Sequence, residues 1–196
     1  MYVLGIDPSA NMTALSVISS RVPERGLCLH ESRLLDQSDL PSRSTPSRLH
    51  RIDDGLSNFL DELDSRAFYL HHAAIEGAFS VGQSSSAAEK YKIEGVIQLC
   101  LYRRDPSVDT DVCPVQSIRT TLLGSGKKRS SDQVNLEIRE TTQRILGIST
   151  LPQVDIANAC AVAIFSLTCS SCDLVKDCQQ RLEGIDSVLA CEHCAA

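Results

Sequence analysis

The chain has 196 residues, of which 42% are hydrophobic and 4% aromatic, with no Trp and a net charge of −6. This length and composition predict one globular domain with a short appendage, and a core built from aliphatic side chains. No segment approaches the roughly 20 apolar residues of a membrane span and no export signal is visible, so we expect a cytoplasmic protein without a membrane partner. The acidic charge argues mildly against nucleic acid as a partner, although basic residues cluster locally.

The first part of the chain predicts three strands followed by a helix. Residues 2–7 and 13–19 are typical of a β-hairpin, and residues 26–34 of a third strand in the same meander. The polar, proline-containing segment 36–47 predicts a loop. Apolar residues then recur at helical spacing from Arg48 to Leu63.

The rest of the chain alternates strands and helices and then has two helices in succession. We expect a strand from 71 that passes into a loop by 79, a helix over 86–104, a strand over 111–116, a basic loop over 122–133, a helix over 131–146 and a buried helix over 154–169. Ser131 or Asp132 is the expected cap of the helix over 131–146. This order predicts an α/β fold, with a mixed sheet and helices on its faces.

Three acidic residues lie in apolar surroundings: Asp7 and Glu76 at the ends of predicted strands, and Asp155 at the start of the last helix. Asn158 follows three residues later, on the same helix face as Asp155. Taken singly, Asp7 is also compatible with a turn cap and Asp155 with the helix dipole. Taken together, they favour a site for Mg²⁺ or Mn²⁺, since carboxylates brought close repel each other unless a divalent cation bridges them. Two such ions can promote phosphodiester hydrolysis.

Four segments resemble the RuvC family of Holliday-junction resolvases in their order and spacing over residues 2–168. They are LGIDPS near the start, AIEGAF at 74–79, VQSIRTTLLGSGKKRSSDQV, and QVDIANACAVAI in the last helix. The resemblance implies an RNase H-like fold with a five-stranded mixed sheet flanked by helices. It also implies a homodimeric, Mg²⁺-dependent endonuclease that resolves four-way DNA junctions by paired cuts.

The same resemblance assigns roles to individual residues. Asp7, Glu76 and Asp155 match catalytic, metal-binding acids of the family. Phe79 matches an aromatic residue that is inserted at the crossover of the junction, and Arg119 a basic residue after the fifth strand. The basic loop of the family, which implies contacts with DNA phosphates, corresponds to Lys127, Lys128 and Arg129.

Asn158 departs from the family pattern, which has a second acid at this position. An amide oxygen can bind a metal but brings no negative charge, so it holds Mg²⁺ less firmly. The alternative to a resolvase is therefore a junction-binding protein with weakened catalysis. A phosphotransferase of the sugar-kinase kind would need glycine-rich phosphate loops, for which the GSG at 124–126 is too little.

The cysteines near the C-terminus define a separate feature. Cys169, Cys172, Cys191 and Cys194 have the spacing C-x2-C-x18-C-x2-C, which fits a structural zinc site with four thiolates. Unligated cysteines and a redox-sensitive thiol pair remain alternatives. We therefore divide the chain into a nuclease domain over 1–169 and a cysteine-rich tail over 170–196.

Overall fold

A computed structural model describes residues 1–9, 11–21, 26–40, 45–77, 85–124 and 130–169. Its elements are β1 (Tyr2–Asp7), β2 (Met12–Arg21), β3 (Gly26–Asp36), α1 (Thr45–Ser65), β4 (Leu70–Gly77), α2 (Ser85–Arg104), β5 (Asp109–Pro114), α3 (Val115–Leu123), α4 (Ser131–Leu146) and α5 (Val154–Cys169). No helix in these ranges is long and apolar enough to cross a membrane.

The five strands form one mixed sheet in the order β3-β2-β1-β4-β5. The first three strands are antiparallel neighbours, whereas β4 runs parallel to β1 and β5 runs parallel to β4. This is the five-stranded α/β architecture that the sequence predicts. Because β1 and β4 are parallel neighbours, their carboxyl ends meet at the same edge of the sheet.

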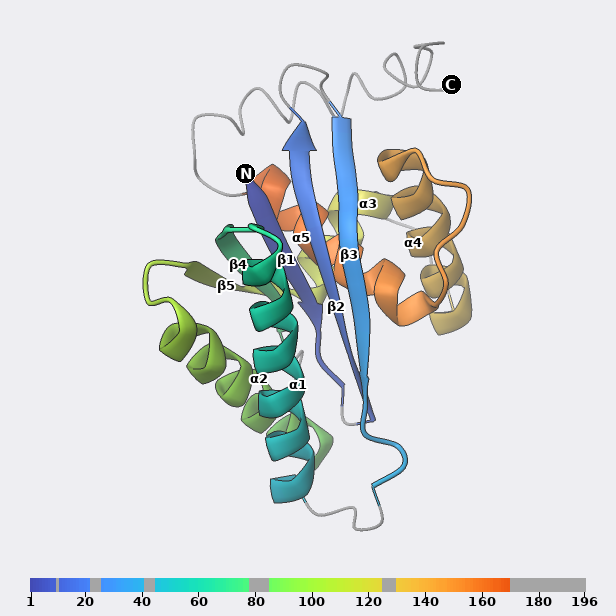
Figure 1. Ribbon diagram of the computed structural model, residues 1–196. Coiled ribbons are helices and arrows are strands. Elements are labelled where there is room, and N and C mark those ends of the chain that lie inside the picture. The colour runs from blue at the N-terminus through green and yellow to red at the C-terminus, as the bar shows by residue number, and fades with distance from the viewer. Residues whose placement is uncertain (10, 22–25, 41–44, 78–84, 125–129, 170–196) are drawn as a thin grey trace.

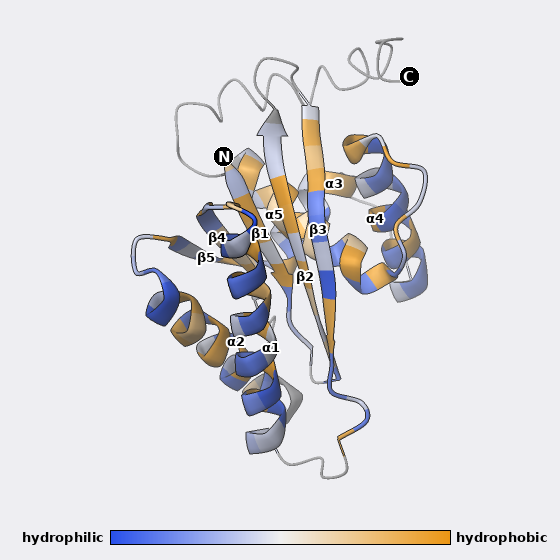
Figure 2. Ribbon diagram, viewed as in Figure 1, coloured by the Kyte–Doolittle hydropathy of each residue, from blue (hydrophilic) through white to orange (hydrophobic). Residues whose placement is uncertain are grey.

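Helices cover both faces of the sheet (Figure 1). Side chains alternate along β1, so Leu4 and Ile6 pack against α1 and α2 while Val3 packs against α5. Helices α3 and α4 complete the layer around α5. Figure 2 shows mostly hydrophilic residues along the outer side of α1, as expected for a helix with one face on the core.

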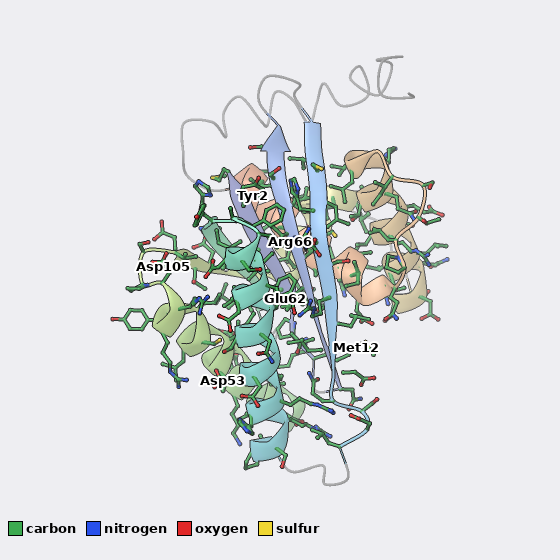
Figure 3. The ribbon with its side chains drawn as sticks, viewed as in Figure 1. Tyr2, Met12, Asp53, Glu62, Arg66 and Asp105 are labelled. Carbon is green, nitrogen blue, oxygen red and sulfur yellow. The ribbon has the colours of Figure 1, made fainter. Side chains whose placement is uncertain are left out.

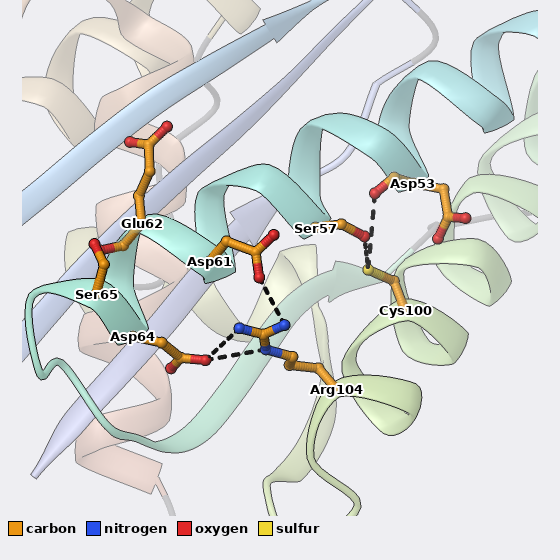
Figure 4. A network of polar contacts seen from close by, with 8 residues as sticks. All are labelled: Asp53, Ser57, Asp61, Glu62, Asp64, Ser65, Cys100 and Arg104. Atoms are coloured by element: carbon orange, nitrogen blue, oxygen red, sulfur yellow. Dashed lines mark hydrogen bonds and ion pairs between the residues drawn. The ribbon is translucent and has the colours of Figure 1, made fainter.

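Polar contacts link α1 to α2 at the surface (Figure 4). Arg104 of α2 contacts Asp61 at 2.7 Å and Asp64 at 2.5 Å, both from α1. Nearby, the Sγ of Cys100 lies 3.3 Å from the Oγ of Ser57. These side chains lie above the apolar contact between the two helices, where the charges remain in reach of water.

Helix α5 lies unusually close to β1, and Gly5 is the reason. A Cβ at position 5 would lie 2.1 Å from the backbone oxygen of Ala159 and 2.8 Å from the Cβ of Ala163. Only a glycine opposite these small residues allows the helix to approach the strand so closely. Since α5 begins at Val154, this contact brings its first turns to the carboxyl end of β1.

Two local predictions are wrong. Residues 115 and 116 do not continue the fifth strand but begin α3, which follows Pro114 directly. Pro114 has a φ of −62° and no N–H, so it ends the strand pairing and suits a helix start. The cap of α4 is Ser130 rather than Ser131 or Asp132, because Ser130 and Gln133 bond each other's backbone N–H in a capping box.

Candidate active site

Asp7 and Glu76 lie side by side at the carboxyl edge of the sheet. Ile6 pairs with Ile75 in the parallel register, so the next residue of each strand is an acid. Asp7 shares the strand face of Val3 and Gly5 and therefore points toward α5. Asp7 is 9% exposed, and the side chain of Glu76 is 16% exposed. In Figure 3, Tyr2 and Met12 mark opposite ends of the sheet, and Met12 lies at the end where β1 finishes.

Asn158 of α5 completes the contact with Asp7. Its side chain hydrogen-bonds to Asp7, and the interaction favours the ionised carboxylate, so the Asn158 amide is the donor. Its carbonyl oxygen, Oδ1, is buried and has no hydrogen-bond partner. A buried acceptor without a partner is costly, and such an atom requires an explanation. Asp155, one turn earlier on α5, adds only a weak repulsion to Asp7.

The two cations near this site do not offset the burial of its carboxylates. Burial, and then repulsion by Glu76, raise the pKa of Asp7 to about 7; the Asn158 hydrogen bond and Lys90 oppose the shift. Burial also raises the pKa of Glu76, against the attraction of Lys90 and Arg119. Desolvation therefore outweighs the cations that the protein supplies. A cation from solution would lower the free energy of the two ionised carboxylates.

Lys90 is a member of the site that the sequence analysis does not identify. Its Nζ lies 3.9 Å from Oε1 of Glu76, and its side chain is 36% exposed. It occupies the same stripe of α2 as the buried Ile93 and Ile97. One signal in the sequence could have identified it: Lys90 stands where the helical period predicts an apolar residue. A lysine at such a position needs a nearby partner for its charge.

The donor set fits a hard divalent cation in part. Within the described ranges, no three His, Cys, Asp or Glu side chains come close enough together to hold a metal ion. Asp155 thus does not join Asp7 and Glu76 in a three-carboxylate cluster. The two buried carboxylates and the unpartnered oxygen of Asn158 are nevertheless all oxygen donors of the kind that Mg²⁺ and Mn²⁺ prefer.

The remaining predicted residues divide into two groups. Arg119 lies on α3, is partly exposed and acts electrostatically on Glu76. The others lie outside the described residues, or, for Cys169, have only their backbone described: Phe79, Lys127, Lys128, Arg129, Cys169, Cys172, Cys191 and Cys194. Asp132, an acid that follows the basic segment in the sequence, is exposed in the first turn of α4.

The five-stranded mixed sheet with helices on both faces is a fold that solved junction resolvases share. A solved structure of RuvC from Thermus thermophilus matches 84% of this chain and 92% of its own length with a TM-score of 0.66 at 21% identity. The yeast mitochondrial Holliday junction resolvase Ydc2 matches 95% of this chain and 84% of its own with a TM-score of 0.55 at 12% identity. At these identities the likeness concerns the fold.

The chain belongs to the RuvC family. The family model described as crossover junction endodeoxyribonuclease RuvC matches residues 3–166. A relative with that name from Francisella tularensis subsp. holarctica is 26% identical over 164 residues, which cover 84% of this chain and 86% of the relative. One from Haemophilus ducreyi is 26% identical over 162 residues, covering 83% and 76%. The match ends before the cysteine-rich tail, so the comparisons give the proposed zinc site no support.

Proposed function

We propose that this member of the RuvC family is a metal-dependent endonuclease that cuts four-way DNA junctions at the site where Asp7 and Glu76 meet. The supporting observation is the buried carboxylate of Asp7 next to the partly buried carboxylate of Glu76, beside the unpartnered oxygen of Asn158. Two carboxylates held this close lower the stability of the protein unless a ligand neutralises them. The ligand proposed here is a divalent cation.

Mg²⁺ is the proposed cation, with Mn²⁺ as its replacement in experiments. Asp7 and Glu76 would be the primary ligands, and Asn158 would contribute its amide oxygen. Asp155 lies one turn earlier on α5, outside this group, and would act on the ion by its charge. When bound, the ion supplies Lewis acidity, which activates water and neutralises charge on the leaving oxygen. The Asn158 amide holds Asp7 ionised and oriented.

Arg119 and Lys90 are the positively charged residues that act on Glu76 at the site. Both act on Glu76 from helices that flank the carboxyl edge of the sheet. We assign Arg119 to the binding of the DNA phosphate, since a guanidinium offers several donors in a fixed geometry. Phe79 follows β4 and the Lys127–Arg129 segment follows α3. For these residues we propose base stacking at the crossover and phosphate contacts, respectively.

A homodimer is the proposed assembly, because two coordinated cuts require two sites. Exposed Tyr91, Leu99 and Tyr102 lie along one stripe of α2, with Gly95 between them. An exposed apolar stripe of this kind is typical of a protein contact. Analytical ultracentrifugation is expected to give a dimer for the intact chain and a monomer for Leu99→Glu; a wild-type monomer would refute the assembly.

The decisive experiment is cleavage of a labelled synthetic four-way junction, with a linear duplex of the same sequence alongside. We expect paired nicks in the junction alone with Mg²⁺ or Mn²⁺, and none with EDTA. Asp7→Asn is expected to bind the junction without cutting it. Binding without cleavage by the wild type would favour the alternative that Asn158 has weakened catalysis, and gain of cleavage by Asn158→Asp would establish it.

The proposal covers the nuclease domain over 1–169 and leaves 170–196 as a distinct tail. A structural zinc ion held by the four tail cysteines remains a proposal from their spacing alone. Metal analysis of the purified full chain is expected to give one zinc per chain, lost in Cys191→Ser. A chain free of zinc would reject it. A cytoplasmic location is part of the same proposal, because the substrate is cellular DNA.

A further inference from the structure

The packing of α2 fixes the position of Lys90 beside the site. It lies on the core-facing stripe of α2, three residues before Ile93, which is fully buried. The neighbouring Glu89 accepts a hydrogen bond from Arg48 of α1 at 2.6 Å, and the side chain of Arg48 is only 12% exposed. This partly buried ion pair and the packing of Ile93 fix the start of α2, and with it the direction of Lys90.

The position of Lys90 relative to Glu76 leaves part of that carboxylate available. Nζ approaches Oε1 at 3.9 Å, a contact between charges rather than a short hydrogen bond. The other oxygen of Glu76 can still serve a metal ion. Asp7 and Asn158 supply the oxygens on the α5 side of the site. Helix α5 itself contains no Lys or Arg that could neutralise them.

The charges then limit how many divalent ions the site can hold. The candidate acids Asp7, Glu76 and Asp155 bring three negative charges, because Asn158 brings none. Lys90 and Arg119 already bring two positive charges to Glu76. Two divalent ions would leave a net charge of +3 in a largely buried site, whereas one ion leaves +1, which a single DNA phosphate neutralises.

From this arrangement, and on the basis of the proposed function, we propose that Lys90 takes the place of a second metal ion, so that each nuclease site binds one divalent cation. Asp7, Asn158 and the Glu76 oxygen that Lys90 does not contact would hold this ion. The ammonium group of Lys90 supplies the remaining positive charge from α2. The neutral Asn158 and the cationic Lys90 thus both make the charge of the site less negative.

The test is the stoichiometry of Mn²⁺ binding to the full-length protein without DNA, measured by electron paramagnetic resonance of free Mn²⁺ and by calorimetry. We expect one Mn²⁺ per nuclease site in the wild type. Lys90→Gln is expected to bind a second Mn²⁺, or to bind the first about tenfold more tightly, because a nearby positive charge is gone. Any ion held by the tail is subtracted by repeating the titration in Cys191→Ser.

Two further variants control for charge and for folding. Lys92→Gln removes the same charge from an exposed position of α2 and should behave as the wild type. Lys90→Met fits the apolar stripe and should reproduce the effect of Lys90→Gln without loss of folding. Two Mn²⁺ ions in the wild type, or Mn²⁺ binding in both Lys90 variants that equals that of the wild type, would overturn the inference and leave the proposed nuclease intact. No Mn²⁺ binding by the wild type would overturn both.

Discussion

Charged side chains meet in two regions of this molecule, and the two are balanced differently. On the outer surface of α1 and α2, Asp53 faces Arg103, and all of the charged groups there are in reach of water. Asp61 and Asp64 both face Arg104 (Figure 4). At the carboxyl edge of the sheet, Asp7 is buried and Glu76 is partly buried, and the nearby cations do not offset the desolvation of the two carboxylates. The first arrangement is nearly neutral energetically. The second costs stability, and this cost indicates a site that awaits a ligand.

The largest expected effect comes from removing one buried charge at that edge. Glu76→Gln preserves the shape of the side chain and removes the negative charge of a proposed metal ligand. We expect junction cleavage to fall by at least about a thousandfold, equivalent to about 4 kcal/mol of lost transition-state stabilisation. Junction binding, measured by gel shift in Ca²⁺, should change by less than about threefold.

Glu140→Gln is the matched control, because Glu140 is an exposed acid on α4. It should cut at the wild-type rate. Cleavage by Glu76→Gln at a rate close to the wild type would remove Glu76 from the site and would end the contrast between the two charged regions.

The close contact of β1 with α5 can be tested by filling the space at Gly5. Gly5→Ala places a Cβ against the backbone oxygen of Ala159, which cannot rotate away. We expect a loss of about 3 kcal/mol in the free energy of unfolding, seen as a fall of roughly 10 °C in Tm. The separation of α5 from β1 would also move Asn158 away from Asp7, so cleavage should fall in the protein that remains folded.

Gly95 provides the comparison for that substitution. A Cβ there meets nothing within 4 Å, and the position is exposed within α2. Gly95→Ala should stabilise the protein by about 0.5–1 kcal/mol, because alanine favours the helix. Equal effects of the two substitutions would contradict the close approach at Gly5.

The sequence predicts the sheet, the main helices and the acids, because each depends on local patterns or on a family motif. Asp7 and Glu76 end apolar strands, and the parallel pairing of β1 with β4 brings them together. The sequence does not predict the contact of Lys90 with Glu76, because this contact depends on how α2 packs against the sheet. The absence of Asp155 from the Asp7–Glu76 pair depends in turn on side-chain positions in α5, which spacing does not determine.

The cost of the buried charge at Asp7 should appear in the stability of the metal-free protein. The pKa of Asp7 is raised to about 7 in the folded state, mainly by burial, against an ordinary value of 3.8. The folded state therefore keeps a proton that the unfolded state loses, and stability falls as the pH rises from about 4 to about 7. In EDTA at pH 8, Asp7→Asn should be more stable than the wild type by about 2 kcal/mol.

Thermal unfolding in EDTA and in Mg²⁺ checks this expectation. The wild type should gain stability on addition of Mg²⁺, because the cation replaces the missing positive charge, and Asp7→Asn should gain much less. A metal-free wild type whose Tm rises between pH 4 and pH 7 would show that Asp7 is not strained by its burial.

The smallest effect is expected in the other charged region. Arg104→Gln removes the contacts with Asp61 and Asp64, but all three side chains are about half exposed. Water and salt screen such pairs, and the lost order of two long side chains offsets part of the attraction. We expect a loss of at most about 1 kcal/mol by urea denaturation, and a smaller one at 0.5 M salt. Cleavage should be unchanged, because Arg104 lies at the far end of α2 from Lys90. A loss of cleavage without a loss of stability would instead assign the α1–α2 surface to DNA binding, and the two regions would then no longer differ in kind.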